Sequence, residues 1–283
     1  MTRRIWQTAS AILLNLPLLG EVKWLCLPVL NCHSCPWAVA ACPIGVIGHF
    51  AAWGMVPFVA LGTILLLGTI FGRAFCGWVC PFGLLQDVLH KIRSPKWVVK
   101  RWMKYIKYML LLVSVLLVPF FWGLETKAFF CKLCPTATLE SLFPRALTEG
   151  NYASLAAGWI RILVFVGFVV LAIVSLRSFC KIFCPIGAIL AICNRFSGYS
   201  LRYEESKCSS CKRCLEECPM DIHIEDFQRE NASDVITVPS ECILCFNCTK
   251  NCSQDGMKSS FWNLKPRPEE GTSGTGEEGR ERG

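Results

Sequence analysis

The chain has 283 residues, of which 53% are hydrophobic and only 18% are charged. Soluble domains carry about 25% charged residues, so this composition argues against an ordinary water-soluble globule. The net charge is +8, but the basic residues lie between apolar runs and form no stripe with interleaved aromatic residues, which disfavours nucleic-acid binding. Basic residues that flank apolar runs are better explained as the loop charges that orient membrane helices. Nineteen cysteines, recurring in CxxC and CxxxC pairs, indicate metal or redox chemistry.

Four apolar stretches predict membrane helices, at residues 5–19, 43–71, 105–122 and 162–176. The stretch 43–71 has no formal charge and exceeds the roughly 20 residues that a spanning helix needs, so we expect one tilted span. The stretch 5–19 is the weakest, because it is short and contains Pro17. It is either a signal peptide or a retained anchor, and the lack of a small-residue cleavage site after Leu19 favours the anchor.

The distribution of basic residues predicts the orientation of these spans. The segment between the second and third spans is rich in them, at Arg73, Lys91, Arg93, Lys96, Lys100, Arg101 and Lys104. Short loops rich in Lys and Arg stay in the cytoplasm. We therefore expect a multi-pass protein of the cell membrane, with this loop and both chain termini in the cytoplasm.

Two eleven-residue segments of the chain match at an offset of 104 positions. They are RAFCGWVCPFG, beginning at Arg73, and RSFCKIFCPIG, beginning at Arg177, and six positions are identical. Each contains a CxxxCP motif; the motif cysteines are Cys76, Cys80, Cys180 and Cys184. A looser match aligns CHSCP, beginning at Cys32, with CKLCP, beginning at Cys131. The membrane half is thus predicted to be two copies of one unit.

Each unit holds two spans, so the copies run parallel and equivalent motifs share a face. If the copies pack about an axis along the membrane normal, the CxxxCP cysteines gather at the cytoplasmic face, where they can ligate a third metal or iron–sulfur centre. The outer loops gather a second set, Cys32, Cys35, Cys131 and Cys134. These either bind metal or form disulfides, and Cys42 adds a fifth thiol where a cluster needs four.

The soluble end of the chain carries two cysteine runs of the bacterial two-cluster ferredoxin pattern. Cross-ligation in this pattern assigns Cys208, Cys211, Cys214 and Cys252 to one 4Fe-4S cluster, and Cys242, Cys245, Cys248 and Cys218 to the other. We expect a membrane domain at 1–200, with repeats at about 1–92 and 93–196, then a ferredoxin domain at 201–262 and a disordered tail at 263–283. The fold class is an α-helical membrane protein of four transmembrane helices with an α+β ferredoxin domain.

These motifs together resemble the membrane-bound polyferredoxins related to NapH, NosR and the CcoG-like oxidase assembly proteins. The resemblance rests on the paired CxxxCP motifs beside membrane helices, followed by the ferredoxin pair. It implies an inner-membrane protein that moves electrons between the quinone pool, soluble partners and an outer acceptor. For CcoG-like members it implies copper reduction.

Three functions are compatible with the sequence. The first is an electron-transfer component of an oxidoreductase system, in which the ferredoxin clusters exchange electrons with the CxxxCP site, and a quinone, a soluble ferredoxin or a partner subunit completes the path. The second is a copper reductase or assembly factor that acts through Cys32 and Cys35. The third is an interaction subunit with structural clusters.

Few other polar residues point to chemistry. His49 is set inside an apolar run, which makes it a functional candidate. His33 is either a metal ligand or a solvated loop residue. Asp87, Glu140 and Glu149 are isolated in the sequence, and we expect solvated surface positions for all three.

Overall fold

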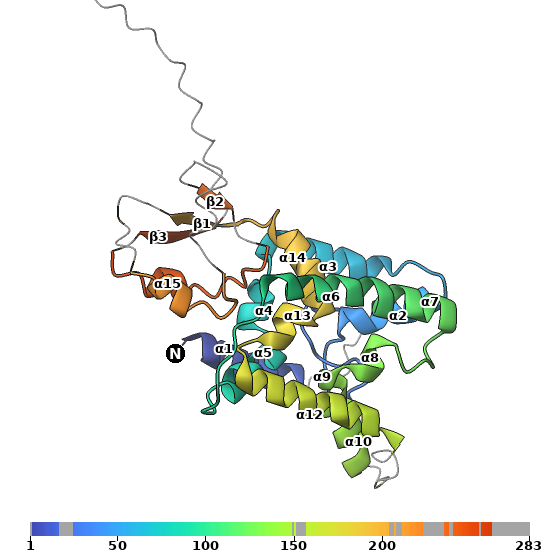
Figure 1. The fold of residues 1–283 in the computed structure, drawn as a ribbon. Helices are drawn as coiled ribbons and strands as arrows, with labels where there is room; N and C mark the ends of the chain where they lie inside the picture. Colours follow the sequence, from blue (N-terminus) through green and yellow to red (C-terminus); the bar gives the residue numbers. More distant parts are fainter. Residues whose placement is uncertain are drawn as a thin grey trace, which may run out of the picture.

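The computed structural model describes residues 2–16, 25–148, 150, 157–203, 207, 211–222, 235–237, 240–254 and 256–261. It contains a body of helices, residues 2–198, and a small head, residues 199–261, at one end of the body (Figure 1). The first helix, α1 (Thr2–Leu14), begins on the head side. The expected tail, 263–283, lies outside the described residues.

A buried loop follows α1 and lies within the body. Asn31 is fully buried, and its side-chain amide donates to the carbonyl oxygens of Leu14 and Ala40. A β-bridge between Cys26 and Ala41 closes the loop at its base. Buried polar groups that are hydrogen-bonded fix a loop in one conformation, so residues 25–42 are part of the core of the body.

The expected single span at 43–71 is wrong, because the chain turns in the middle of this stretch. It forms two helices, α2 (Pro43–Ala52) and α3 (Phe58–Phe71), which pack against each other. Gly54 adopts a φ of +66° between them, and Pro57 supplies no backbone N–H. At 1.5 Å per residue α2 is about 15 Å long. It therefore enters the body only part of the way before the chain returns along α3.

The remaining helices of the body form two similar groups. After α3 come α4 (Ala74–Trp78) and α5 (Pro81–Leu89), and after α12 (Trp159–Val174) come α13 (Ser178–Ile182) and α14 (Pro185–Asn194). One long helix consists of η2 (Arg101–Tyr105), α6 (Ile106–Leu110), the π-helical segment η3 (Leu111–Leu117) and α7 (Val118–Trp122). Between it and α12 lie α8 (Phe130–Leu133), α9 (Pro135–Ala137), η4 (Thr138–Leu142) and α10 (Phe143–Thr148).

Apolar side chains cover much of the outer surface of the body. Large examples are Phe58 on α3, Met109 and Phe121 on the long helix, and Leu163 on α12, all more than 60% exposed. Among the described residues, one helix, Trp102–Trp122, is long and apolar enough to cross a bilayer, and α2, α3, α12 and α14 are shorter apolar helices. An exposed apolar surface of this extent marks contact with a membrane or a protein partner.

The described residues of the head form a three-stranded antiparallel sheet and two short helices. The strand order is β2 (Val235–Thr237), β1 (Tyr199–Tyr203), β3 (Met257–Phe261), with Leu201 opposite Ile236 and Ser259. The helices α15 (Arg213–Glu216) and α17 (Asn247–Lys250) pack against each other. Each begins after a residue in the left-handed conformation, Lys212 or Phe246. The two cysteine runs therefore share one local backbone geometry.

Candidate metal centres

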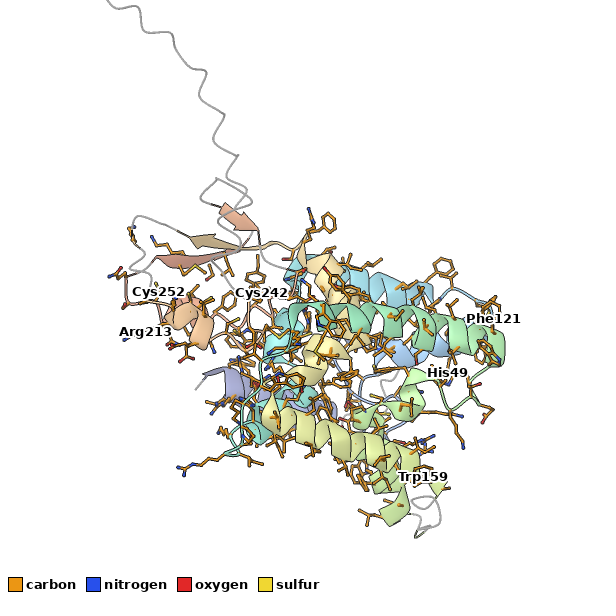
Figure 2. All side chains as sticks on the ribbon, viewed as in Figure 1. His49, Phe121, Trp159, Arg213, Cys242 and Cys252 are labelled. Atoms are coloured by element: carbon orange, nitrogen blue, oxygen red, sulfur yellow. The ribbon has the colours of Figure 1, made fainter. Side chains whose placement is uncertain are left out.

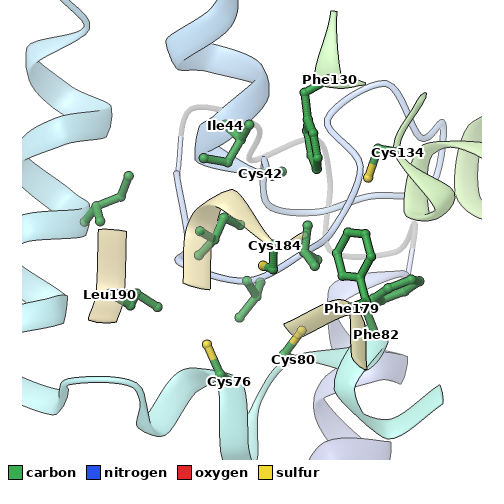
Figure 3. Packing of buried hydrophobic residues seen from close by; sticks show 14 of the residues in the cluster. Cys42, Ile44, Cys76, Cys80, Phe82, Phe130, Cys134, Phe179, Cys184 and Leu190 are labelled. Atoms are coloured by element: carbon green, nitrogen blue, oxygen red, sulfur yellow. The ribbon is translucent and has the colours of Figure 1, made fainter. Parts of the chain in front are cut away.

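The four CxxxCP cysteines lie together in the body, and we call them the inner thiol group (Cys76, Cys80, Cys180 and Cys184). All four are buried. Cys80 is the N-cap of α5 and Cys184 the N-cap of α14, each followed by a proline at the first helical position. Their backbone angles match within about 10° in φ and ψ. The two motifs thus share one backbone geometry at their second cysteine; Cys80 and Cys184 are drawn in Figure 3.

The inner thiols are close enough to affect one another electrostatically. Burial raises the pKa of Cys184, and the neighbouring thiols of Cys180, Cys76 and Cys80 raise it further. Burial also raises the pKa of Cys80 to about 12. Buried thiols of this kind keep their protons at neutral pH unless a cation takes the place of the proton, as a bound metal does.

Two arginines that precede the CxxxCP motifs flank this group, and both are fully buried. Each arginine reaches from its own motif to the glycine of the other motif. The Arg177 guanidinium lies where Gly83 leaves room, and an added Cβ there would sit 3.5 Å from its Nη2. The Arg73 guanidinium lies in the same way at Gly187, with a corresponding distance of 3.2 Å. Each glycine of a CPxG sequence therefore makes space for the arginine of the other motif.

The buried arginines differ in their partners. Arg177 makes a bidentate pair with Asp87, both distances being 2.8 Å, and donates to the carbonyl oxygen of Cys76 at 3.0 Å. Arg73 donates through Nη1 to Glu241 of the head at 2.8 Å, while its Nε and Nη2 have no hydrogen-bond partner among the described residues. Two guanidinium charges beside four thiols are suited to stabilise thiolates bound to a metal.

Asp87 is buried in this network, so the expected solvated position is wrong. Besides Arg177 it pairs with Arg3 of α1. Burial by itself raises the pKa of Asp87, but the hydrogen bonds and charges of the two arginines outweigh burial and leave the pKa below its ordinary value. Asp87 is therefore ionised and anchors Arg177 and the N-terminus of the chain.

Hydrogen bonds also reach the sulfur atoms of the inner thiol group. The Gln86 side-chain amide donates to Cys180 Sγ at 3.2 Å, and the Gly187 backbone N–H donates to Cys184 Sγ at 3.3 Å. The oxygen of the Gln86 amide accepts from the Phe179 backbone N–H at 3.1 Å, which fixes the direction of the amide. Donors aimed at cysteine sulfur are one of the means by which proteins set the potential of an iron–sulfur cluster.

In the head, the structure brings together the cysteines of one predicted cluster. Burial raises the pKa of Cys242, and the neighbouring thiols of Cys245, Cys248 and Cys218 raise it further. Burial also raises the pKa of Cys248 to about 12. Apolar side chains, among them Ile243 and Leu244, line the cavity beside these thiols. We call this the proximal cluster site, because it is the one that faces the body. Of the ligands predicted for the other cluster, Cys211, Cys214 and Cys252 are described, and Cys208 lies outside the described residues.

The proximal cluster site rests directly on the inner motifs. The Trp78 indole N–H donates to the carbonyl oxygen of Leu244 at 2.9 Å, and the Asn194 amide donates to that of Cys242 at 3.0 Å. Gly77, between Cys76 and Cys80, allows the closest approach, since a Cβ there would lie 2.4 Å from the carbonyl oxygen of Ile243. In Figure 2 Cys242 accordingly lies at the body, with Cys252 farther out.

A buried ion network holds the head in this position. Glu241 accepts from both Arg73 and Lys107, whose side chains are 0% exposed. Lys181 of α13 pairs with Asp221 of the head. The sequence did not indicate that Lys107, six residues inside the long apolar helix, pairs with an acidic residue of the head. Its burial is explained by Glu241, because a buried cation needs a paired anion.

The second group of thiols surrounds a cavity of about 300 Å³ on the far side of the inner group. Its thiols are those of Cys32, Cys42, Cys131 and Cys134, which we call the cavity thiol group. Burial raises the pKa of Cys131, and Cys42, Cys134 and Cys32 raise it further. Cys35, expected in this set from its CxxCP motif, is buried beside Ala38 and is not among the residues that line the cavity. Among the described residues, no disulfide joins any two of these five cysteines.

The cavity thiol group and the inner thiol group share the interior of the body, although the sequence places the cavity cysteines in loops outside the apolar stretches. Leu30 lines the cavity, and its backbone is within hydrogen-bonding reach of the Cys80 thiol. Cys42, Cys134, Cys80 and Cys184 also belong to one continuous apolar core (Figure 3). The buried loop 25–42 brings the cavity thiols into this core, because it carries Cys32 and Cys42 back into the body.

Two histidines and a carboxylate complete the surroundings of the cavity. His33 and His49 both line it, with ring centroids 5.1 Å apart in an edge-to-face arrangement. The His49 Nδ1 lies 2.8 Å from the carbonyl oxygen of Gly45, and the His33 ring fills the space where a Gly45 Cβ would be. Glu140 accepts from the backbone N–H of Cys32 at 2.6 Å, and burial raises the pKa of Glu140 to about 7. Glu140 is thus no freely solvated residue.

The spacing of these thiols bears on what they can bind. Among the described residues, no three Cys, His, Asp or Glu side chains converge closely enough to hold a single metal ion. A four-iron cluster spreads its four cysteine ligands over four different irons. Each thiol group offers the number of cysteines that such a cluster requires.

Comparison with known proteins identifies the family. A model of a 4Fe-4S binding domain matches residues 53–100, 108–144 and 157–202, and a model of a 4Fe-4S dicluster domain matches residues 200–253. An uncharacterized protein of Methanocaldococcus jannaschii is 31% identical over 232 residues, which are 78% of this chain and 86% of the relative. The chain belongs to the polyferredoxin-like family of NapH and NosR type. The resemblance seen in the sequence is thereby confirmed.

Other relatives of this polyferredoxin carry names that refer to ferredoxin or regulation. The ferredoxin-type protein NapH of Haemophilus influenzae is 23% identical over 205 residues, 70% of this chain and 65% of NapH. The regulatory protein NosR of Pseudomonas aeruginosa is 29% identical over 191 residues, 63% of this chain but only 24% of NosR. No solved structure matches. The polyferredoxin thus contains iron–sulfur binding domains, as its two cysteine runs predicted.

Proposed function

We propose that the protein is a membrane-embedded electron carrier, in which the head holds two 4Fe-4S clusters that exchange electrons with a metal centre at the inner thiol group. The observation that carries this proposal is the contact between the two. Ile243, in the proximal cluster loop, meets Gly77, in the first CxxxCP motif, with no room for a side chain between them. A ferredoxin attached only as an interaction module would not need its cluster loop to be seated there.

The order of the centres follows from the same contact. The proximal cluster site is within the apolar core that includes Cys76 and Cys184, since Cys245 and Ile243 belong to that core. Cys211 is exposed and Cys252 half-buried on the outer part of the head. A soluble partner therefore meets the outer cluster, and electrons pass through the proximal cluster to or from the inner centre.

We further propose that the body is multi-pass, with α1, α3, the long helix and α12 in the bilayer as two parallel repeats. The long helix of 21 residues is about 31 Å long, which matches the roughly 30 Å hydrocarbon layer. The matching caps of α5 and α14 and the crossed arginines support the repeat. The shorter α2 enters the bilayer without crossing it.

The head side of the body is the cytoplasmic side in this proposal. The basic segment 91–104 lies there, since Lys96 donates to the carbonyl oxygen of Ile173 at the end of α12 that leads to α13. Arg3 is on the same side, through Asp87. Cytoplasmic loops carry the excess of Lys and Arg. A quinone in the bilayer or a partner subunit then exchanges electrons with the body.

The test uses the full chain with its clusters in proteoliposomes that contain a long-chain quinone. The head is reduced chemically without oxygen, and its reoxidation is followed by absorbance. We expect a Cys80→Ala, Cys184→Ala variant to reoxidise at least tenfold more slowly, while the head clusters keep their electron paramagnetic resonance (EPR) signals. Cys193→Ala removes a buried thiol of the body outside both thiol groups and serves as the control. Equal rates in all three proteins would contradict the proposal.

A further inference from the structure

The cavity beyond the inner thiol group has the features of a separate binding site. Four thiols from two distant parts of the chain surround it: Cys32 and Cys42 from one side, Cys131 and Cys134 from the other. Its volume of about 300 Å³ is larger than a single ion requires and admits a compact inorganic cluster. We propose that the cavity thiol group binds a four-iron, four-sulfide cluster, distinct from the centre at the inner thiol group.

The equivalence of the cap positions supports this ligand set. Cys42 is the N-cap of α2 and Cys134 the N-cap of α9, and each is followed by proline. Their φ and ψ angles, −65° and 122° against −64° and 125°, agree with each other and with those of Cys80 and Cys184. The body therefore repeats one thiol-presenting cap four times, twice at each thiol group. This makes Cys42, and not Cys35, the counterpart of Cys134.

Backbone N–H groups at the starts of α2 and α9 surround two of the cavity thiols. The backbone N–H groups of Ile44 and Gly45 lie near the Cys42 thiol, and that of Ala137 lies near the Cys134 thiol, but neither thiol makes a cap hydrogen bond in the structure. A four-iron cluster with four thiolates carries net negative charge, and N–H donors at the sulfur atoms stabilise that charge.

Cationic and neutral side chains of the cavity wall suit the same ligand. Lys132 and Arg161 line the cavity, together with the His33 and His49 pair. The acidic residue that lines the wall, Glu125, is engaged with Lys132 at 3.4 Å and is otherwise exposed. A second carboxylate, Glu140, accepts from the backbone N–H of Cys32 at 2.6 Å. Apolar contacts from Phe129 and Phe130 close the space on the side of α8.

Ligation by Cys42 and ligation by Cys35 predict opposite results when single thiols are removed. The full chain is purified without oxygen from iron-replete cells, and iron and acid-labile sulfide are measured per chain. We expect Cys42→Ala to lose about four iron and four sulfide atoms, one cluster's worth. The matched control is Cys35→Ala, which removes an equally buried thiol of the same loop and keeps the full content.

Several outcomes would overturn the proposal. It fails if Cys35→Ala loses the iron and Cys42→Ala keeps it, if both keep it, if both lose it, or if the metal lost is one zinc ion per chain. Cys131→Ala is the second variant, because its half-buried thiol is removed with less effect on packing, and it must lose the same four iron atoms. The EPR signals of the head clusters, unchanged in each variant, show that the chain is folded. Binding at this site does not depend on electron transfer at the inner group, so either proposal can fail alone.

Discussion

The ion network beneath the head predicts how strongly the head is held to the body. Glu241→Gln removes one negative charge and leaves Arg73 and Lys107, both 0% exposed, without an anion. Removing one partner of a buried ion pair costs about 3–5 kcal/mol. Glu241 is itself 15% exposed, and the glutamine oxygen still accepts a hydrogen bond, so we take the lower end, about 3 kcal/mol. This corresponds to a docking equilibrium weakened on the order of 100-fold.

Hydrogen exchange at the interface measures this change directly. Ile243 and Leu244 are 1% exposed against the body, so their amides exchange slowly while the head is docked. In Glu241→Gln we expect exchange in the peptide that contains them to be faster by on the order of 100-fold. Glu216→Gln, at an exposed position of the same head, is the matched control and should change exchange little. Equal protection in the two variants would refute the view that the buried network holds the head.

Three further substitutions test the surroundings of the inner thiol group. The pKa of Asp87 is lowered in the folded protein, so its stabilising effect is present above its unfolded pKa and is lost as pH falls. Asp87→Asn should therefore lower the free energy of unfolding by the same amount from pH 8 to about 5. The difference between the two proteins should shrink below about pH 4 in unfolding titrations. Gln86→Leu removes a hydrogen-bond donor to Cys180 Sγ, which stabilises the reduced state of the inner centre. If the reduced state loses about 1.4 kcal/mol of stabilisation, a redox titration should show a potential lower by about 60 mV. An unchanged potential would contradict the assigned hydrogen bond. Gly77→Ala places a Cβ 2.4 Å from the carbonyl oxygen of Ile243, so reoxidation of the head by quinone should slow while cluster content stays the same.

The ferredoxin part of the chain was predictable because its information is local. Two runs of closely spaced cysteines define the ligands of a two-cluster head, and no long-range contact has to be known. The inner thiol group was predictable for a different reason, the duplicated segment at an offset of 104 positions. Duplication also marks Arg73 and Arg177, which are identical residues at equivalent positions. Their role was missed because a basic residue beside an apolar run resembles a membrane flank.

The cavity thiol group could be predicted only in part, because spacing alone favours Cys35, which does not line the cavity. Cys35 completes a CxxCP motif, whereas Cys42 stands ten residues from Cys32 and comes to it only through the folded loop. The sequence does contain a signal for Cys42: Cys42-Pro-Ile-Gly45 is identical to Cys184-Pro-Ile-Gly187. The break in the stretch 43–71 was missed because apolar composition continues through Gly54 and Pro57. Hydropathy does not register a turn that only backbone geometry requires.

The central claim is that the proximal cluster of the head and a centre at the inner thiol group are neighbours that share electrons. Magnetic coupling between two reduced centres tests it most directly, because the coupling requires both centres to be present and close. We predict that the EPR spectrum of the fully reduced protein shows a split or broadened proximal-cluster signal. In Cys180→Ala, Cys184→Ala the signal should become that of a simple two-cluster ferredoxin. Identical spectra from the two proteins, at equal occupancy of the head, would contradict the account.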